Sequence, residues 1–146
     1  MSGIGIFCIE TGNWAENLTQ RTSIQPALGL LNAVNEIPFF HRSASTVGEF
    51  WHYLEQWKSQ GHRTYPILYF CFHGLPDLIH FSDGDVTLGE LEARLDASCS
   101  GSILYFSSCQ TLKLDEERLK SFLVRTSAIA VGGYRKSVNW MESAAF

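Results

Sequence analysis

The sequence lacks the features that mark several large classes of protein. Its 146 residues contain no apolar run long enough to cross a membrane. The N-terminal MSGIGIFCIE has no basic segment and no small-residue cleavage site, so it does not resemble a secretory signal. Lysine and arginine number 11 against 15 aspartates and glutamates, and they form no cluster. We therefore expect a cytoplasmic protein that binds neither nucleic acid nor a membrane.

Cysteine is also scarce, and its spacing is not that of a metal site. The four cysteines are Cys8, Cys71, Cys99 and Cys109, and no CxxC pair occurs. The close pair Cys71 and His73 shares a strand face but has no two further ligands nearby, so we expect no metal. We expect free thiols rather than a disulfide framework. Cys8 and Cys71 are expected to pack in the core, and Cys99 to lie partly buried in a loop.

The sequence does contain enough apolar residues for one packed domain, with 45% hydrophobic and 13% aromatic residues. Strand-like and helix-like segments alternate along the chain, which predicts a mostly parallel sheet with helices on both faces. Pro38 places its strand at an edge. We therefore predict a three-layer α/β sandwich with a small β-hairpin insertion. The expected strands are 3–10, 36–41, 65–72, 102–106 and 127–132, the helices 23–35, 46–59, 87–96 and 114–124, and the hairpin 78–86.

Local signals support the helix boundaries. Thr46 with Glu49, and Thr87 with Glu90, are capping boxes that open two of the helices. Ser23 is a candidate N-cap for the helix over 23–35. We expect that helix to pack through one apolar face, made of Ile24, Ala27, Leu28, Leu31 and Val34.

Two apolar strands end on reactive side chains. ILYFCFHGL (67–75) reaches His73 and Gly74, and ILYFSSCQT (103–111) reaches Cys109. Ligands of an open parallel sheet bind outside the carboxyl ends of its strands, so adjacent strands would bring His73 and Cys109 to one edge. An imidazole there can take the thiol proton and create a nucleophile. The N–H groups of Gly74 and Cys109 are then candidates for an oxyanion hole.

These blocks resemble those of a known superfamily. FCFHG and YFSSCQT are similar to the His-Gly and nucleophile blocks of the caspase-like cysteine peptidases, which include caspases, metacaspases and bacterial CHAT proteases. LIHFSDGDVTLGELEARL resembles the CHAT hairpin and helix, and SAIAVGGYRKSVNW resembles the following strand and pocket loop. The whole chain also resembles a bacterial family of caspase-like domains whose opening strand carries Cys-Ile-Glu.

The resemblance implies a single caspase-like domain over 1–146 and a cysteine endopeptidase activity. His73 would act as general base and acid, and Cys109 would form the acyl-enzyme thioester. No metal or organic cofactor is implied. The implied partners are a peptide or protein substrate and a second copy or partner subunit. The implied role is that of a regulated bacterial protease in defence or signalling. The final ESAAF looks like the start of another helix, so we expect C-terminal elements to be missing.

The chain also departs from the superfamily pattern. The caspase pentapeptide Gln-Ala-Cys-x-Gly is absent, and Ser108 stands where some relatives carry the Asp or Gln that shapes the specificity pocket, so substrate preference does not transfer. Glu10 is a candidate to line the pocket or to orient His73, with helix capping or loop stabilisation as the alternatives. Further pocket candidates follow the first and last strands. These are Asn13, Trp14, Tyr134, Arg135, Asn139 and Trp140.

Two other interpretations stay open. The dyad could be silent, leaving a caspase-like binding or regulatory module. A receiver- or TIR-like signalling domain fits less well, because a receiver needs an acidic pair after the first strand and only Glu10 is present. We expect His52 and His62 at the surface. Four histidines besides His73 show no partner pattern. These are His41, His52, His62 and His80.

Overall fold

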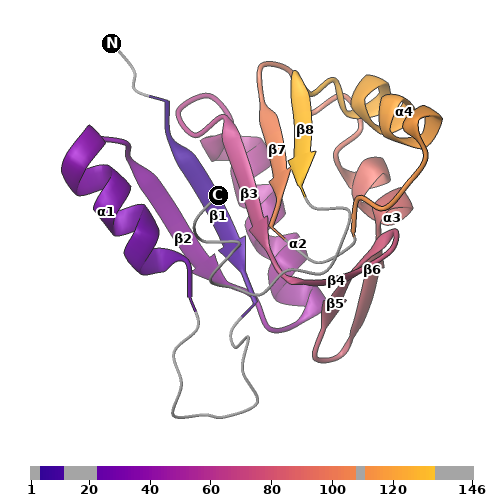
Figure 1. Ribbon diagram of the computed structural model, residues 1–146, viewed down its shortest axis with the longest axis horizontal. Helices are drawn as coiled ribbons and strands as arrows, with labels where there is room; N and C mark the ends of the chain where they lie inside the picture. The colour runs from indigo at the N-terminus through magenta and orange to yellow at the C-terminus, as the bar shows by residue number, and fades with distance from the viewer. Residues whose placement is uncertain (1–3, 12–22, 108–110, 134–146) are drawn as a thin grey trace.

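The computed structural model describes residues 4–11, 23–107 and 111–133 (Figure 1). A five-stranded sheet, with every strand pair parallel, has the order β2-β1-β3-β7-β8. Its strands are β1 (Ile6–Glu10), β2 (Phe39–Ser43), β3 (Ile67–Cys71), β7 (Ile103–Phe106) and β8 (Ala130–Gly133). The helices are α1 (Gln25–Asn35), α2 (Val47–Gln56), α3 (Leu88–Arg94) and α4 (Glu116–Thr126). The predicted three-layer α/β architecture is confirmed, with β2 at an edge as Pro38 indicated.

A second, smaller sheet follows β3 directly. It is antiparallel, has the order β4-β5-β6, and lies beside the carboxyl ends of the parallel strands (Figure 1). Its strands are β4 (His73–Leu75), β5 (Leu78–Phe81) and β6 (Gly84–Thr87). The expected hairpin is therefore present as β5 and β6, but the prediction missed a third strand. The residues after β3 form this strand, β4, which pairs with β5. This third strand begins at His73.

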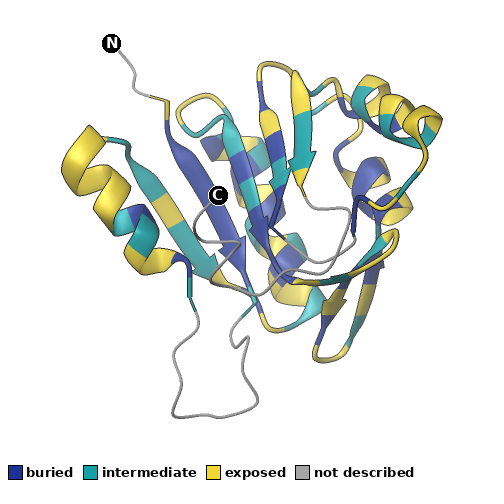
Figure 2. Cartoon of the chain, in the orientation of Figure 1, coloured by how far each residue is buried: buried dark blue, intermediate teal, exposed yellow. Residues whose placement is uncertain are grey.

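The larger core lies between the parallel sheet and α2, α3 and α4. Alternate residues of β1, β3 and β7 point into it, as the period of two requires, and these side chains are buried (Figure 2). Phe50 of α2 is fully buried at its centre, with ring centroids 5.7 Å from Phe70, 5.3 Å from Phe72 and 5.1 Å from Phe81. This cluster joins the large sheet to the small one, since Phe81 belongs to β5. The cluster thereby fixes β5 against the core, and β4 is paired with β5.

The opposite sheet face is covered by α1 at its β1–β2 side. Ile24 and Leu28 pack there against Ile6, Cys8 and Cys71. The predicted apolar face of this helix is correct only for its first half. Its second half carries three exposed apolar side chains because α1 lies at the β2 edge of the sheet (Figure 1). These are Leu30, Leu31 and Val34, with exposed fractions of 65%, 39% and 69%.

The ends of the helices follow their local signals, with two differences. Thr46 and Thr87 accept the N–H groups of Glu49 and Glu90 at 3.2 and 3.0 Å, so both threonines are N-caps at the predicted helix starts. The helix expected to continue to residue 59 instead changes to a π-helical turn, η1 (Trp57–Gly61). Helix α1 begins after Ile24, so Ser23 is not its N-cap. Among the described residues, no helix is both long and apolar enough to span a membrane.

Candidate active site

The two strands that end on reactive residues are neighbours. β3 and β7 are parallel and in register, with Tyr69 opposite Tyr105 and Phe70 opposite Phe106. Both strands therefore deliver the chain to the same sheet edge. After β3, His73 opens β4 with its side chain exposed. The segment 108–110, which contains Cys109, lies outside the described residues.

The residues on either side of that segment are bound close to the end of β3. The Ser107 N–H donates to the Phe70 carbonyl at 2.7 Å. On the other side, the Thr111 carbonyl accepts the Asp77 N–H at 3.2 Å, and the Thr111 hydroxyl donates to the Leu78 carbonyl at 3.2 Å. One flank is thus held by β3 and the other by the turn between β4 and β5. Both flanking residues are fully buried.

His73 lies in a row of polar residues across the small sheet. It is directly opposite His80 of β5, which is directly opposite Asp85 of β6. Directly paired residues share one face of a sheet, and this face is exposed, since the alternate residues Ile79 and Val86 are buried in the core. His80 Nδ1 is hydrogen-bonded to Asp85 Oδ1 at 2.6 Å. The prediction that His80 has no partner was wrong.

A signal for this pair was present in the sequence. With Ser82 and Asp83 as the turn, hairpin register places His80 opposite Asp85. Gly74 of β4, the candidate oxyanion residue beside His73, is opposite Ile79 of β5 and is only half-buried. It therefore lies one position from the exposed polar row, in backbone that the β4–β5 pairing holds.

Glu10 ends β1 and is almost completely buried, with 2% exposed. Its Oε1 accepts from the Ser23 hydroxyl at 2.6 Å and from His41 Nε2 at 2.7 Å, and its Oε2 accepts the Ile24 N–H at 2.9 Å. Ile24 is the N-cap of α1, so Glu10 binds the backbone where that helix begins. His41, which was expected to lack a partner, bonds to Glu10 from the neighbouring strand β2. Nothing local in the sequence signals a pair so far apart along the chain.

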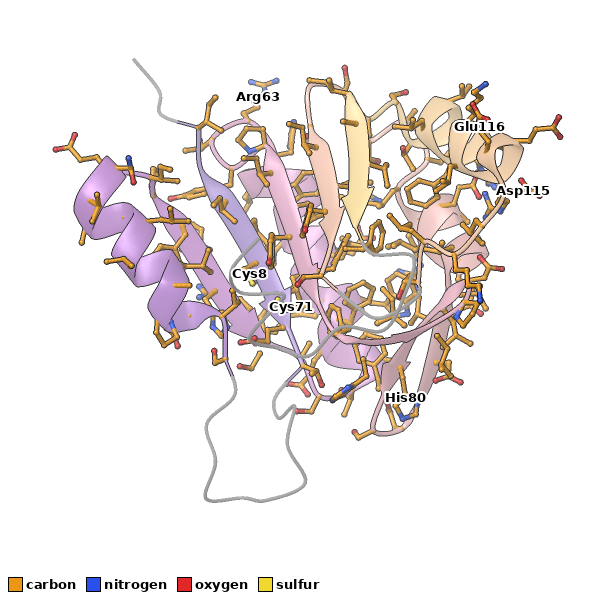
Figure 3. All side chains as sticks on the ribbon, in the orientation of Figure 1. Cys8, Arg63, Cys71, His80, Asp115 and Glu116 are labelled. Carbon is orange, nitrogen blue, oxygen red and sulfur yellow. The ribbon has the colours of Figure 1, made fainter. Side chains whose placement is uncertain are left out.

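The three described cysteines are all buried thiols. Cys8 and Cys71 lie on the adjacent strands β1 and β3 (Figure 3), and burial, followed by the contact with Cys71, raises the pKa of Cys8 well above its ordinary value. Cys99 is fully buried, so the expectation of partial burial was wrong, and burial raises its pKa to about 12. Because thiolates are the reactive form, Cys8 and Cys99 are poor nucleophiles at neutral pH.

The remaining pocket candidates belong to parts of the chain outside the described ranges. Asn13, Trp14, Ser108, Tyr134, Arg135, Asn139 and Trp140 lie outside them, as does Cys109. Within the described ranges, no group of three or more histidine, cysteine, aspartate or glutamate side chains could hold a metal ion.

Comparison with known proteins agrees with this architecture. The model of a family of unknown function, DUF6642, matches residues 4–146. The chain belongs to the DUF6642 family. Among solved structures, caspase-1 from Spodoptera frugiperda superposes on this DUF6642 chain with a TM-score of 0.51 at 17% sequence identity. The match covers 78% of this chain and 50% of the caspase, so the chain spans about half the length of that protein.

At this identity the similarity shows the fold, which in this DUF6642 chain is caspase-like. Among curated protein sequences, none matches the chain.

Proposed function

We propose that this protein is a caspase-like cysteine endopeptidase that uses His73 and Cys109 to hydrolyse peptide bonds. One observation carries the proposal. The adjacent parallel strands β3 and β7 deliver the chain to one sheet edge, where β3 continues into His73 and β7 into the segment that contains Cys109. The hydrogen bonds of Ser107 and Thr111 hold both flanks of that segment beside β3 and the β4–β5 turn. The caspase-like fold supports the same assignment.

The proposed reaction proceeds through an acyl-enzyme. His73 takes the proton from the Cys109 thiol, and the thiolate attacks the carbonyl carbon of the peptide. The N–H groups of Gly74 and Cys109 stabilise the oxyanion. The carbon–nitrogen bond then breaks, and His73 gives its proton to the leaving amine. Water, deprotonated by His73, hydrolyses the thioester and restores the thiol. A peptide or protein is the proposed substrate.

Thiol alkylation offers a direct test, because the described cysteines are buried. The intact protein would be treated with iodoacetamide at neutral pH, and its adducts would be mapped by mass spectrometry. We expect one fast adduct at Cys109, absent in Cys109→Ser and slowed about tenfold in His73→Ala. A peptide library, with Cys109→Ser as the control, would then report cleavage that requires the thiol.

The opposite result favours the other function. If Cys109 reacts no faster than the same thiol in unfolded protein, and His73→Ala changes nothing, the peptidase proposal is wrong. The caspase-like domain would then be a catalytically silent binding or regulatory module.

A further inference from the structure

We propose that His80, held by Asp85, is a positioning residue that stabilises the protonated form of His73 during the reaction. This inference rests on the proposed peptidase function. It starts from the row formed by His73, His80 and Asp85 on the exposed face of the small sheet. The three residues come from the neighbouring strands β4, β5 and β6. The caspase-like dyad contains His73 but neither of the other two residues.

The register places the three side chains close enough to act together. Directly opposed residues of antiparallel strands have Cβ atoms about 4.5–5.5 Å apart on one face. The His80 imidazole therefore lies beside that of His73, within reach of a direct or water-bridged hydrogen bond. On its far side, His80 Nδ1 is 2.6 Å from Asp85 Oδ1. The buried partners Ile79 and Val86 on the other face keep β5 and β6 in this register.

The Asp85 contact fixes which nitrogen of His80 carries the proton. An ionised carboxylate can only accept hydrogen bonds, so His80 Nδ1 donates. In the neutral ring, Nε2 of His80 then has a free lone pair and is an acceptor. An imidazolium, by contrast, has two N–H donors. The row therefore offers an acceptor beside His73 at the step when His73 is charged.

The chemistry follows from this arrangement. When His73 takes the proton of Cys109, one of its N–H groups is needed for the leaving amine and the other can donate a hydrogen bond. His80 Nε2 is the acceptor that the strand register offers for it, and the bond to Asp85 holds His80 in this tautomer. The proton remains on His73, and no proton passes to His80 or Asp85. The effect is to increase the fraction of Cys109 present as thiolate.

A role in stability alone does not explain the pair. The side chains of His80 and Asp85 are 57% and 47% exposed. Exposed ion pairs contribute little to folding because water and salt screen them. The same screening limits the expected catalytic effect to about three- to fivefold.

The test measures the rate of Cys109 alkylation in the full chain at neutral pH. Asp85→Asn is expected to slow it about three- to fivefold, Asp85→Glu to restore most of the rate, and His80→Phe to slow it at least as much as Asp85→Asn. His80→Phe keeps a planar ring and strand preference but removes both nitrogens. Glu90→Gln, which removes an exposed carboxylate from the neighbouring helix, is the matched control and should react like the wild type.

A second readout would not respond to a merely structural role. Nitrogen NMR of the imidazole rings should show His80 protonated at Nδ1 in the wild type, with that preference lost in Asp85→Asn. Wild-type rates in Asp85→Asn and His80→Phe, while His73→Ala is slow, would overturn this inference and leave the peptidase proposal intact. Protonation of wild-type His80 at Nε2 would also overturn it. Equal, slow rates in the wild type and His73→Ala would overturn both proposals.

Discussion

Replacing Glu10 with glutamine changes one atom at a buried junction between β1, α1 and β2. The substitution keeps the size of the side chain, so it leaves no cavity. The carboxylate accepts three hydrogen bonds, from Ser23, Ile24 and His41, at 2.6–2.9 Å. In Glu10→Gln the remaining oxygen can still accept from Ser23 and His41. The new NH₂ group either faces the Ile24 N–H, and two donors cannot bond to each other, or turns toward Ser23 and His41, which must then accept a hydrogen bond instead of donating one.

The magnitude follows from these contacts. A buried donor left without a partner costs about 1–3 kcal/mol, and a charge-assisted hydrogen bond is worth about 1 kcal/mol more than a neutral one. Because only 2% of Glu10 is exposed, water cannot replace the lost acceptor. We expect Glu10→Gln to lower the free energy of unfolding by about 1–3 kcal/mol.

Urea unfolding followed by circular dichroism would measure this change. Glu117→Gln is the matched control, because Glu117 is exposed on α4 and its loss should change stability by less than about 0.5 kcal/mol. A double-mutant cycle with His41→Ala should give a coupling of about 1–2 kcal/mol between the two side chains. A loss below about 1 kcal/mol in Glu10→Gln, or no coupling, would refute this account of the junction.

Three further predictions concern stability. Phe50→Ala should cost about 3–5 kcal/mol in urea unfolding, because this fully buried ring joins both sheets; a loss under about 2 kcal/mol would contradict that role. In thermal melts, Gly29→Ala in α1 should stabilise the protein by about 0.5–1 kcal/mol, since a Cβ there meets nothing within 4 Å. Gly5→Ala should destabilise the protein, since a Cβ there would lie 2.8 Å from the Thr64 carbonyl oxygen, and effects of the same sign in the two variants would disprove the comparison. Burial raises the pKa of Cys99 from 9.0 to about 12, so between these values the folded protein keeps a proton that the unfolded chain has lost. The contribution of the Cys99 thiol to the free energy of unfolding is complete below pH 9.0 and falls by about 1.4 kcal/mol per pH unit between pH 9.0 and about 12. Cys99→Ala should therefore reduce the loss of stability above pH 9.0, and an unchanged slope would count against burial of this thiol as the cause.

The parts of the fold that the sequence predicts best are those with local or periodic signals. The long apolar runs of β3 and β7 indicate buried parallel strands, and the structure pairs them side by side. The capping boxes at Thr46 and Thr87 need only three residues of context, so helices α2 and α3 begin where expected. The turn signal at Ser82, Asp83 and Gly84 likewise predicts a hairpin over 78–86, and β5 and β6 form it.

The errors arise where a residue's surroundings come from distant segments. Cys99 looks like a loop residue, yet its N–H donates to the Thr126 carbonyl at 2.9 Å and the loop is packed against the end of α4. Val34 continues the apolar period of α1 but is exposed, because the sheet ends at β2. The Glu10–His41 bond depends on the pairing of β1 with β2. For the candidate site, the juxtaposition of His73 with Cys109 stays a prediction.

The strand order also determines how the chain can fold. β3 is the middle strand, and its partners come from opposite ends of the sequence: Ile67 pairs with Ile6 on one side and with Ile103 on the other. Contacts between such distant residues close large loops before they gain stability, so we expect folding in milliseconds to seconds rather than microseconds. During synthesis β1 has no β3 to pair with until residue 71 has emerged. A nascent chain that ends before β7 would leave one edge of β3 open to pairing with other chains.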